Sequence, residues 1–253
     1  MATKLLNRTP QLDCSLLQFG FFDDFYRFTA TQFWTRVTTS AGLGVAEIAA
    51  VDADGTGGIM QLSTADADDD EEWIFTTNEI FKVKVDKPIL AVARLKLTQS
   101  GTNTADMFFG LVDAAATVPV DGSSALVAGK HGVAFFKPGG VATLSVASTS
   151  TAAGWGNLTV TERSTGTGWE TYVIFIESLS ATDKRITFHL DESGGQEWRQ
   201  LKGAATERLI RHNWTLTDTA AGTGELSLML GVKTTDTAAQ LLEIDYAGCW
   251  QLR

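Results

Sequence analysis

The C-terminal run from Leu241 to Leu252 alternates between two kinds of side chain. One set is mostly apolar or aromatic and the other is mostly polar: Leu242, Ile244, Tyr246, Gly248, Trp250 and Leu252 alternate with Glu243, Asp245, Cys249 and Gln251. Successive side chains of a β-strand point to opposite faces, so this period of two predicts a strand with one buried face. Residues 186–190 and 226–233 show the same alternation. We therefore expect strands to build the fold, with residues 241–252 as the final strand.

Other runs are apolar on both faces and rich in β-branched and aromatic residues. They are Ile89–Leu97, Met107–Val112, Val133–Phe136 and Tyr172–Ile176. Short runs of this composition are typical of central strands. Clusters of Gly, Asn, Asp and Ser, such as residues 54–58 and 193–195, separate the runs and favour turns. The pattern predicts an all-β fold, a two-sheet antiparallel jelly-roll sandwich.

Two segments interrupt this pattern of strands and turns. The best candidate for helix is a short turn near Asp236 to Gln240, and the small-residue stretch Ala147 to Gly156 is expected to form a long surface loop.

The chain has 253 residues, and a β-sandwich can reach roughly 200–250 residues as one domain. Residues 1–18 show few turn signals and no alternation, so we expect an N-terminal arm (1–18) followed by one sandwich domain (19–253). The arm carries apolar side chains that are costly to leave in water, namely Leu5, Leu6, Leu12, Leu16 and Leu17. Two alternatives stay open: these leucines pack back on the domain, or they bury against another chain as a docking segment.

Composition and charge exclude several classes of function. The formal net charge is −10 and the basic residues are scattered, which argues against nucleic-acid binding. No apolar run approaches the ~18 residues of a membrane span, and the first residues lack the features of a secretory signal, so we expect a protein folded in a cytoplasm. Cys14 and Cys249 are expected to be reduced thiols there, although a bridge between the ends of the chain is an open alternative.

Several segments resemble those of concanavalin A-like domains, the superfamily of legume-type lectins, laminin-G-like modules and laminarinase-type glucanases, and the order in which they occur along the chain supports the resemblance. Residues 225–233 followed by 241–252 resemble the closing hairpin of these domains. Phe21–Phe25 with Trp34 resembles the opening strand and its first crossing. Pro88–Leu97, with Arg94, resembles the long inner strand, and residues 169–177 with 185–191 resemble a hairpin. The resemblance covers roughly residues 20–253 and implies a sandwich of this type.

The run Gly231 to Thr234 leading into Ile244-Asp245-Tyr246, with no catalytic motif, also resembles jelly-roll domains of tailed-bacteriophage virion proteins. By analogy, the chain is expected in a virion, as a capsid decoration or head-fibre protein. The implied partners are other virion proteins, such as the major capsid protein, and further copies of the chain in a dimer or trimer.

The acidic clusters do not favour catalysis. A glucanase of this superfamily would carry a Glu-x-Asp-x-x-Glu pattern along one strand, and a retaining enzyme needs two carboxyl groups about 5–5.5 Å apart. Residues 68–72 are predicted to form a solvated acidic turn, and residues 191–197 a hairpin turn with charged shoulders. We therefore expect no enzymatic activity, and a degenerate glucanase-like hydrolase is the third hypothesis for function.

A few acidic and histidine residues are the candidates for binding a metal ion. No cofactor is expected, although Asp52 and Asp54 could supply oxygen ligands to calcium. His131, His189 and His212 lack the spacing of a zinc site.

Among the tryptophans, Trp34, Trp73, Trp169 and Trp250 are expected in the core. Trp155, between two glycines, is the candidate for an exposed contact with a host glycan or with a protein. A glycan-binding module that recognises host polysaccharide is the alternative to the virion structural role.

Overall fold

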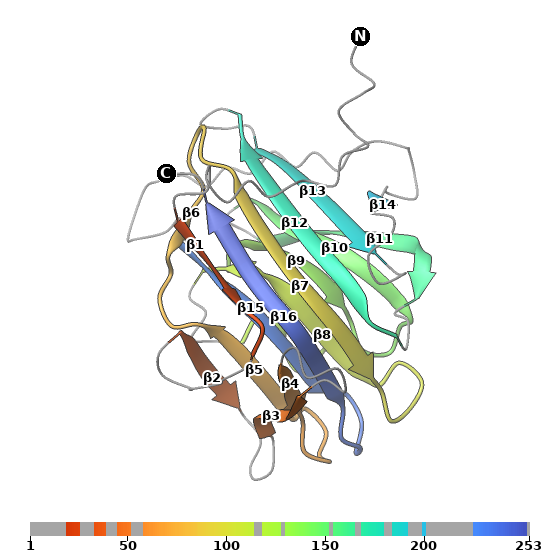
Figure 1. Cartoon of the computed structure of the whole chain (residues 1–253). Helices are drawn as coiled ribbons and strands as arrows, with labels where there is room; N and C mark the ends of the chain where they lie inside the picture. Colours follow the sequence, from red (N-terminus) through yellow and green to blue (C-terminus); the bar gives the residue numbers. More distant parts are fainter. Residues whose placement is uncertain are drawn as a thin grey trace.

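The computed structural model describes residues 19–25, 33–38, 45–51, 58–113, 118–127, 130–151, 154–164, 168–179, 184–191, 199–200 and 225–251. Within these ranges the regular structure is strand only, and the strands form two antiparallel sheets packed face to face (Figure 1). The predicted all-β sandwich is confirmed. No helix in the described ranges is long and apolar enough to span a membrane.

Sheet A contains the first and the last described strands. Its order is β14-β13-β12-β7-β16-β4-β3, and β1 also pairs with β16. The bounds are β1 Phe19–Asp23, β3 Val45–Val51, β4 Gly58–Ser63, β7 Ile89–Thr98, β12 Glu170–Ser178, β13 Lys184–Asp191, β14 Arg199–Gln200 and β16 Leu241–Gln251.

Sheet B has the order β11-β10-β9-β8-β15-β5-β2, and β6 also pairs with β15. The bounds are β2 Trp34–Thr38, β5 Glu71–Thr76, β6 Phe81–Lys82, β8 Ala105–Val112, β9 Gly132–Lys137, β10 Thr143–Thr151, β11 Gly154–Ser164 and β15 Glu225–Thr234. The four apolar runs identified in the sequence correspond to β7, β8, β9 and β12, each with a strand on either side.

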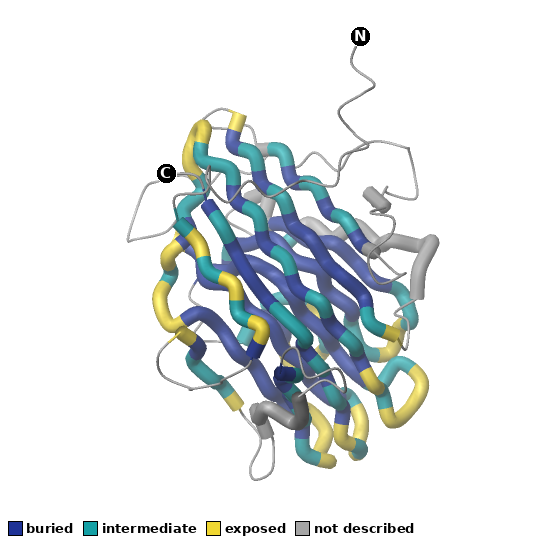
Figure 2. Tube along the Cα trace, viewed as in Figure 1, coloured by how far each residue is buried: buried dark blue, intermediate teal, exposed yellow. Residues whose placement is uncertain are grey.

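The main core lies between the two sheets. Alternate residues of β7 are buried, from Ile89 through Leu97, while the residues between them are partly exposed on the outer face of sheet A. In sheet B the strands β5, β8 and β9 are buried along their whole length (Figure 2). The two sheets therefore differ: the outer face of sheet B is covered over β5, β8 and β9, and that of sheet A is partly open.

Three local predictions are wrong. Strands β15 and β16 do not form a closing hairpin, because β15 belongs to sheet B and β16 to sheet A. The connection between them has no helical turn near Asp236–Gln240, because the Thr234 hydroxyl bonds with Asp236 and Ala238 and the Gln240 amide bonds with Thr234 and Ser100. These contacts hold the segment as an arch between the sheets.

The third wrong prediction is the surface loop over Ala147–Gly156. Most of this stretch belongs to the antiparallel pair β10 and β11, in which Thr149 pairs with Trp155. The stretch is rich in Thr and Ser, and Thr fits a strand as a β-branched residue.

Candidate functional site

Three aromatic side chains gather on the outer face of sheet A, where β1 pairs with β16. The Phe22 ring lies 5.5 Å from the Tyr246 ring and 6.2 Å from the Trp250 ring, measured between centroids, with interplanar angles of 35° and 23°. Phe22 is 54% exposed, and the other two side chains are partly exposed. We call Phe22, Tyr246 and Trp250 the aromatic platform.

Glycines lie beneath the Trp250 ring of the platform. A Cβ atom on Gly20 would stand 2.3 Å from Cδ1 of Trp250, and one on Gly248 would stand 2.6 Å from Cη2. Any larger side chain at these two positions would meet the indole, so the glycines let its opposite ends lie close to the backbone of β1 and β16.

A β-bulge in β16 places Tyr246 and Trp250 of the platform on the outer face. The pairing with β7 shifts between Ile244, which is opposite Leu95, and Tyr246, which is opposite Arg94, so that Asp245 is the extra residue. Before the bulge, Leu242 and Ile244 are buried in the core; after it, Ala247 and Cys249 are buried instead. A bulge of one residue reverses which side chains face the core.

The sequence alternation therefore holds for only half of this strand. It placed Tyr246 and Trp250 on the buried face with Leu242, and this prediction is wrong for both aromatic residues. Asp245 and Tyr246 instead lie side by side on the outer face.

Four charged residues continue the outer face next to the platform. Arg94 Nη1 lies 2.6 Å from Asp245 Oδ2, and Lys96 Nζ lies 2.6 Å from Glu243 Oε2. Both cations also lie over the ring of Trp169, with Arg94 Cζ at 5.3 Å and Lys96 Nζ at 5.8 Å from its centroid. We call Arg94, Lys96, Glu243 and Asp245 the charged ladder.

The ladder and the platform form one strip along β16, because Arg94 is the register partner of Tyr246. Trp169, predicted to be a core residue, is partly exposed beside this strip. The ion pairs are partly exposed and contribute little stability by themselves, but they hold polar groups in fixed positions next to an apolar surface.

The outer face of sheet B is closed by a second apolar cluster. Trp73, Phe108, Phe136 and Met229 are buried there, and Val120 of the segment 118–127 is buried with them. The predicted core positions of Trp34 and Trp73 are confirmed, with Trp34 lying in the main core.

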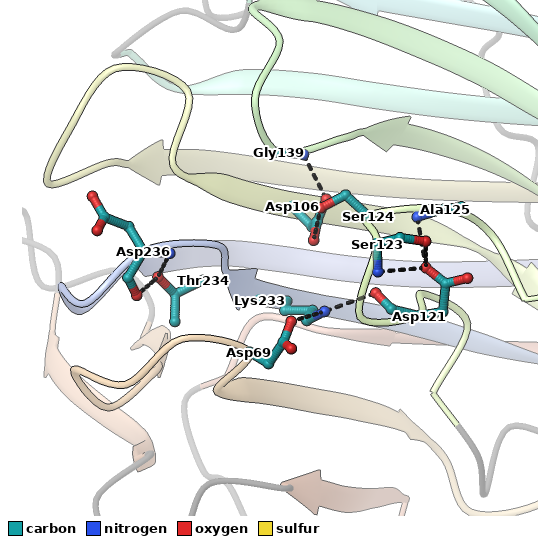
Figure 3. A network of polar contacts seen from close by, with 10 residues as sticks. All are labelled: Asp69, Asp106, Asp121, Ser123, Ser124, Ala125, Gly139, Lys233, Thr234 and Asp236. Carbon is teal, nitrogen blue, oxygen red and sulfur yellow. Dashed lines mark hydrogen bonds and ion pairs between the residues drawn. The ribbon is translucent and has the colours of Figure 1, made fainter.

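A polar network fastens the segment 118–127 over sheet B (Figure 3). Lys233 Nζ donates to the Asp121 carbonyl at 2.7 Å and pairs with Asp69 Oδ1 at 2.6 Å. Asp106 accepts from the Gly139 amide at 2.6 Å and from the Ser124 hydroxyl at 3.1 Å. These contacts join the segment 118–127 to strands β8 and β15 of sheet B.

Burial shifts the pKa of two groups in this region. Desolvation raises the pKa of Asp106 above its usual value, against the opposing effect of its hydrogen bonds. Desolvation lowers the pKa of Lys137 to about 8, and this ammonium donates to the Ala105 carbonyl at 2.7 Å.

The acidic run at residues 68–72 is only partly a solvated turn. Asp68 and Asp69 are exposed, as predicted, but Glu71 and Glu72 are buried in β5. Glu72 accepts two hydrogen bonds from the Arg36 guanidinium, one of them from Nη2 at 2.8 Å, which compensates for its burial.

Trp155 does not stand exposed in a loop, so that premise is wrong. It lies in β11 and is partly buried, its Nε1–H donates to the Val127 carbonyl at 3.2 Å, and its ring lies edge-on to Phe108. A contact role for Trp155 stays a prediction.

The other predicted site residues are not described. Leu5, Leu6, Leu12, Leu16, Leu17, Asp52, Asp54, Cys14 and His212 lie outside the described residues. Cys249 is buried with a free thiol, and burial raises its pKa well above the usual range. The described ranges hold no group of three or more His, Cys, Asp or Glu side chains that could bind a metal ion.

Sequence reasoning missed the strip itself, including Glu243 and Asp245. These two carboxylates share the outer face and match the first two positions of the Glu-x-Asp-x-x-Glu pattern, but Gly248 occupies the third. That partial match was the one signal in the sequence that could have drawn attention to this strand.

Solved structures with the same fold span nearly the whole chain. An endo-1,3-β-glucanase from Streptomyces sioyaensis is 15% identical, with a TM-score of 0.53 over 92% of this chain and 95% of that one. Peanut lectin is 10% identical, with a TM-score of 0.59 over 92% and 97%. A protein of unknown function from Shewanella oneidensis MR-1 is 11% identical, with a TM-score of 0.55 over 98% and 95%.

No family model and no curated protein sequence matches the chain. The structural likeness confirms the concanavalin A-like jelly roll that the sequence resembled. At these identities it shows the fold alone, and both lectins and a glucanase share that fold.

Proposed function

We propose that this chain, with its concanavalin A-like fold, is a carbohydrate-binding protein without catalytic activity that uses the outer strip of sheet A. The observation that carries the proposal is the aromatic platform, in which the exposed ring of Phe22 lies nearly parallel to Trp250. One face of a sugar ring is lined with C–H bonds and stacks on aromatic rings, while its hydroxyls need polar partners at the edge. The charged ladder supplies such partners next to the platform.

The environment of the carboxylates supports binding without hydrolysis. Glu72 is bonded to Arg36, Asp106 to Gly139 and Ser124, and Asp113 to the His131 amide. On the strip, Glu243 and Asp245 are each paired with a cation, and the third position of the catalytic pattern is Gly248. A retaining glycosidase needs one carboxyl group free to attack and a second able to donate a proton.

The test compares Phe22→Ala with Phe33→Ala in the full chain. Phe33 is 66% exposed and precedes β2 of sheet B, so it controls for the loss of an exposed ring elsewhere. A glycan array followed by calorimetry should show binding by the parent and by Phe33→Ala, and about tenfold weaker binding by Phe22→Ala. Equal binding by all three proteins would refute the site, and release of reducing ends from a bound glycan would refute the non-catalytic role.

A second candidate is the structural role in a phage particle, with the capsid protein and further copies of the chain as partners. Its support in the fold is a pair of exposed apolar side chains, Val85 and Leu179, on two loops that meet where the Asp86 amide donates to the Ser178 carbonyl at 3.4 Å. Exposed apolar side chains on adjacent loops suit docking to another protein.

For this role, residues 2–18 are deleted and Val85→Ser/Leu179→Ser is made separately. We expect each change to reduce cosedimentation with particles or the oligomer mass measured by light scattering. Unchanged assembly in both proteins would contradict this role.

A further inference from the structure

The strip follows the length of β16, and this length limits the size of the ligand that it can contact. Trp250, Tyr246, Asp245 and Glu243 follow one another along the outer face of β16, from the platform to the far end of the ladder. Glu243 lies opposite Lys96 of β7 and Trp250 lies opposite Leu90, so with the bulge taken into account the strip spans six strand positions, about 20 Å at the usual rise of a strand. This length suits a run of several sugar units and exceeds what one unit can contact.

The charges of the strip determine whether it can accept a charged ligand. Its two cations, Arg94 and Lys96, are each neutralised by a carboxylate at 2.6 Å. The chain as a whole carries a formal charge of −10. An acidic glycan would need unpaired cations to replace its hydration and would be repelled by this net charge.

A neutral glycan meets neither difficulty. The Arg94 guanidinium has five N–H donors, and its contact with Asp245 uses one of them. Trp169 lies against both Arg94 and Lys96, which holds the two cations in place before any ligand arrives. Hydroxyl groups, which donate and accept, match this mixture of donors and acceptors.

We infer that the strip binds a neutral polysaccharide chain lying along β16, with sugar rings stacked on Phe22 and Trp250 and hydroxyls bonded to Arg94, Asp245 and the Lys96–Glu243 pair. This inference rests on the proposed function and adds to it the charge, the length and the direction of the ligand.

The experiment titrates the full chain with neutral β-glucan oligosaccharides, from the monosaccharide to the hexasaccharide, and with polygalacturonate at low and at high salt. The affinity for the neutral series should rise about tenfold or more from the monosaccharide to the tetrasaccharide. Polygalacturonate should not bind. Trp250→Ala should weaken the binding of the longer oligosaccharides, whereas Phe33→Ala should leave it unchanged.

Two variants test the role of charge directly. Glu243→Gln and Asp245→Asn each leave one cation without its partner, so they should acquire salt-sensitive binding of polygalacturonate and lose affinity for the neutral series. Two variants are needed because Asp245 is the extra residue of the bulge, so Asp245→Asn could disturb the strand. Glu243 lies outside the bulge, so Glu243→Gln tests the role of charge alone.

The outcomes separate the inference from the proposed function. Binding of polygalacturonate by the parent chain through Phe22, or equal affinity for the monosaccharide and the hexasaccharide, would overturn the inference and leave a sugar-binding platform. Absence of binding to both kinds of glycan would overturn both. So would a dimer of the parent chain that Trp250→Ala converts to monomer, because the platform would then be an interface between copies.

Discussion

Gly248→Ala tests whether the close fit between Trp250 and the backbone is what makes the platform. The new Cβ would stand 2.6 Å from Cη2 and 3.1 Å from Cζ3 of Trp250, and 3.0 Å from the Phe21 carbonyl oxygen, whereas ordinary contacts begin at 3.4 Å. The near edge of the indole must therefore rise by 0.8 Å, the difference between 3.4 Å and 2.6 Å. The ring would then tilt away from its nearly parallel orientation to Phe22, which is an interplanar angle of 23° in the parent chain.

The tilt has a modest cost in stability because Trp250 is partly exposed and can move outward. An off-rotamer side chain of this kind costs about 1 kcal/mol. For a chain of this size that corresponds to a fall in Tm of about 2–4 °C. Glycan affinity should fall about fivefold or more, since the Phe22 and Trp250 rings would no longer be nearly parallel.

The assay measures urea unfolding and glycan titration on the same preparations. Gly122→Ala is the control, because a Cβ there would meet only the Asp69 carboxylate, whose nearest atom, Oδ2, stands at an ordinary 3.4 Å. If Gly248→Ala binds glycan as tightly as the parent chain and is equally stable, the indole does not need to lie against Gly248, and our account of the platform is refuted.

Three further changes test other parts of the molecule. Gly231→Ala would place a Cβ 1.9 Å from Cε3 of Trp73, which is fully buried. We therefore expect the free energy of unfolding, measured in urea, to fall by about 1–3 kcal/mol or more. A smaller loss would show that the outer cluster of sheet B is loosely packed. Arg36→Met leaves the buried Glu72 carboxylate without its cation. We expect the free energy of unfolding to fall by about 2 kcal/mol, allowing for the partial exposure of Arg36. Adding Glu72→Gln should restore much of this stability, and a double variant as unstable as Arg36→Met would contradict the pairing. Lys137 has a pKa of about 8 in the folded chain and a reference value of 10.5, so the unfolded chain binds more protons between these pH values. This group therefore makes the free energy of unfolding rise with pH across that window, and Lys137→Met should remove this part of the slope in denaturant titrations from pH 7.5 to 10.5; an unchanged slope would show that Lys137 is not desolvated.

Much of the fold follows from local patterns in the sequence. Apolar runs such as Met107–Val112 identify central strands, because every side chain of a strand buried on both faces points into an apolar environment. The connection after β15 could not be predicted in the same way. Two alternating strands separated by a short polar segment look alike whether they pair in one sheet or cross between two, and the difference here depends on the contacts of Thr234 and Gln240 with distant residues.

The candidate site depends on tertiary contacts even more strongly. Phe22, Arg94 and Trp250 come from three separate strands, and the ion pairs of the ladder join residues about 150 positions apart in the chain, as the separation of 151 between Arg94 and Asp245 shows. The sequence marks the aromatic residues as strand residues, but it does not show which face each of them occupies.

The bulge at Asp245 explains why the face of β16 could not be read from its sequence. After Ile244, one set of positions holds Tyr246, Gly248 and Trp250 and the other holds Ala247 and Cys249, so either set could face a core by hydrophobicity. Volume decides between them. Ala247 lies opposite Ala93 and Cys249 opposite Ala91, so the inner face of sheet A is lined there by small side chains, in a core that large rings such as Tyr172, Phe109 and Phe135 already fill. Trp250 in place of Cys249 would overpack that core, so one extra residue in the strand turns the large aromatic side chains outward and creates the surface on which the proposed function depends.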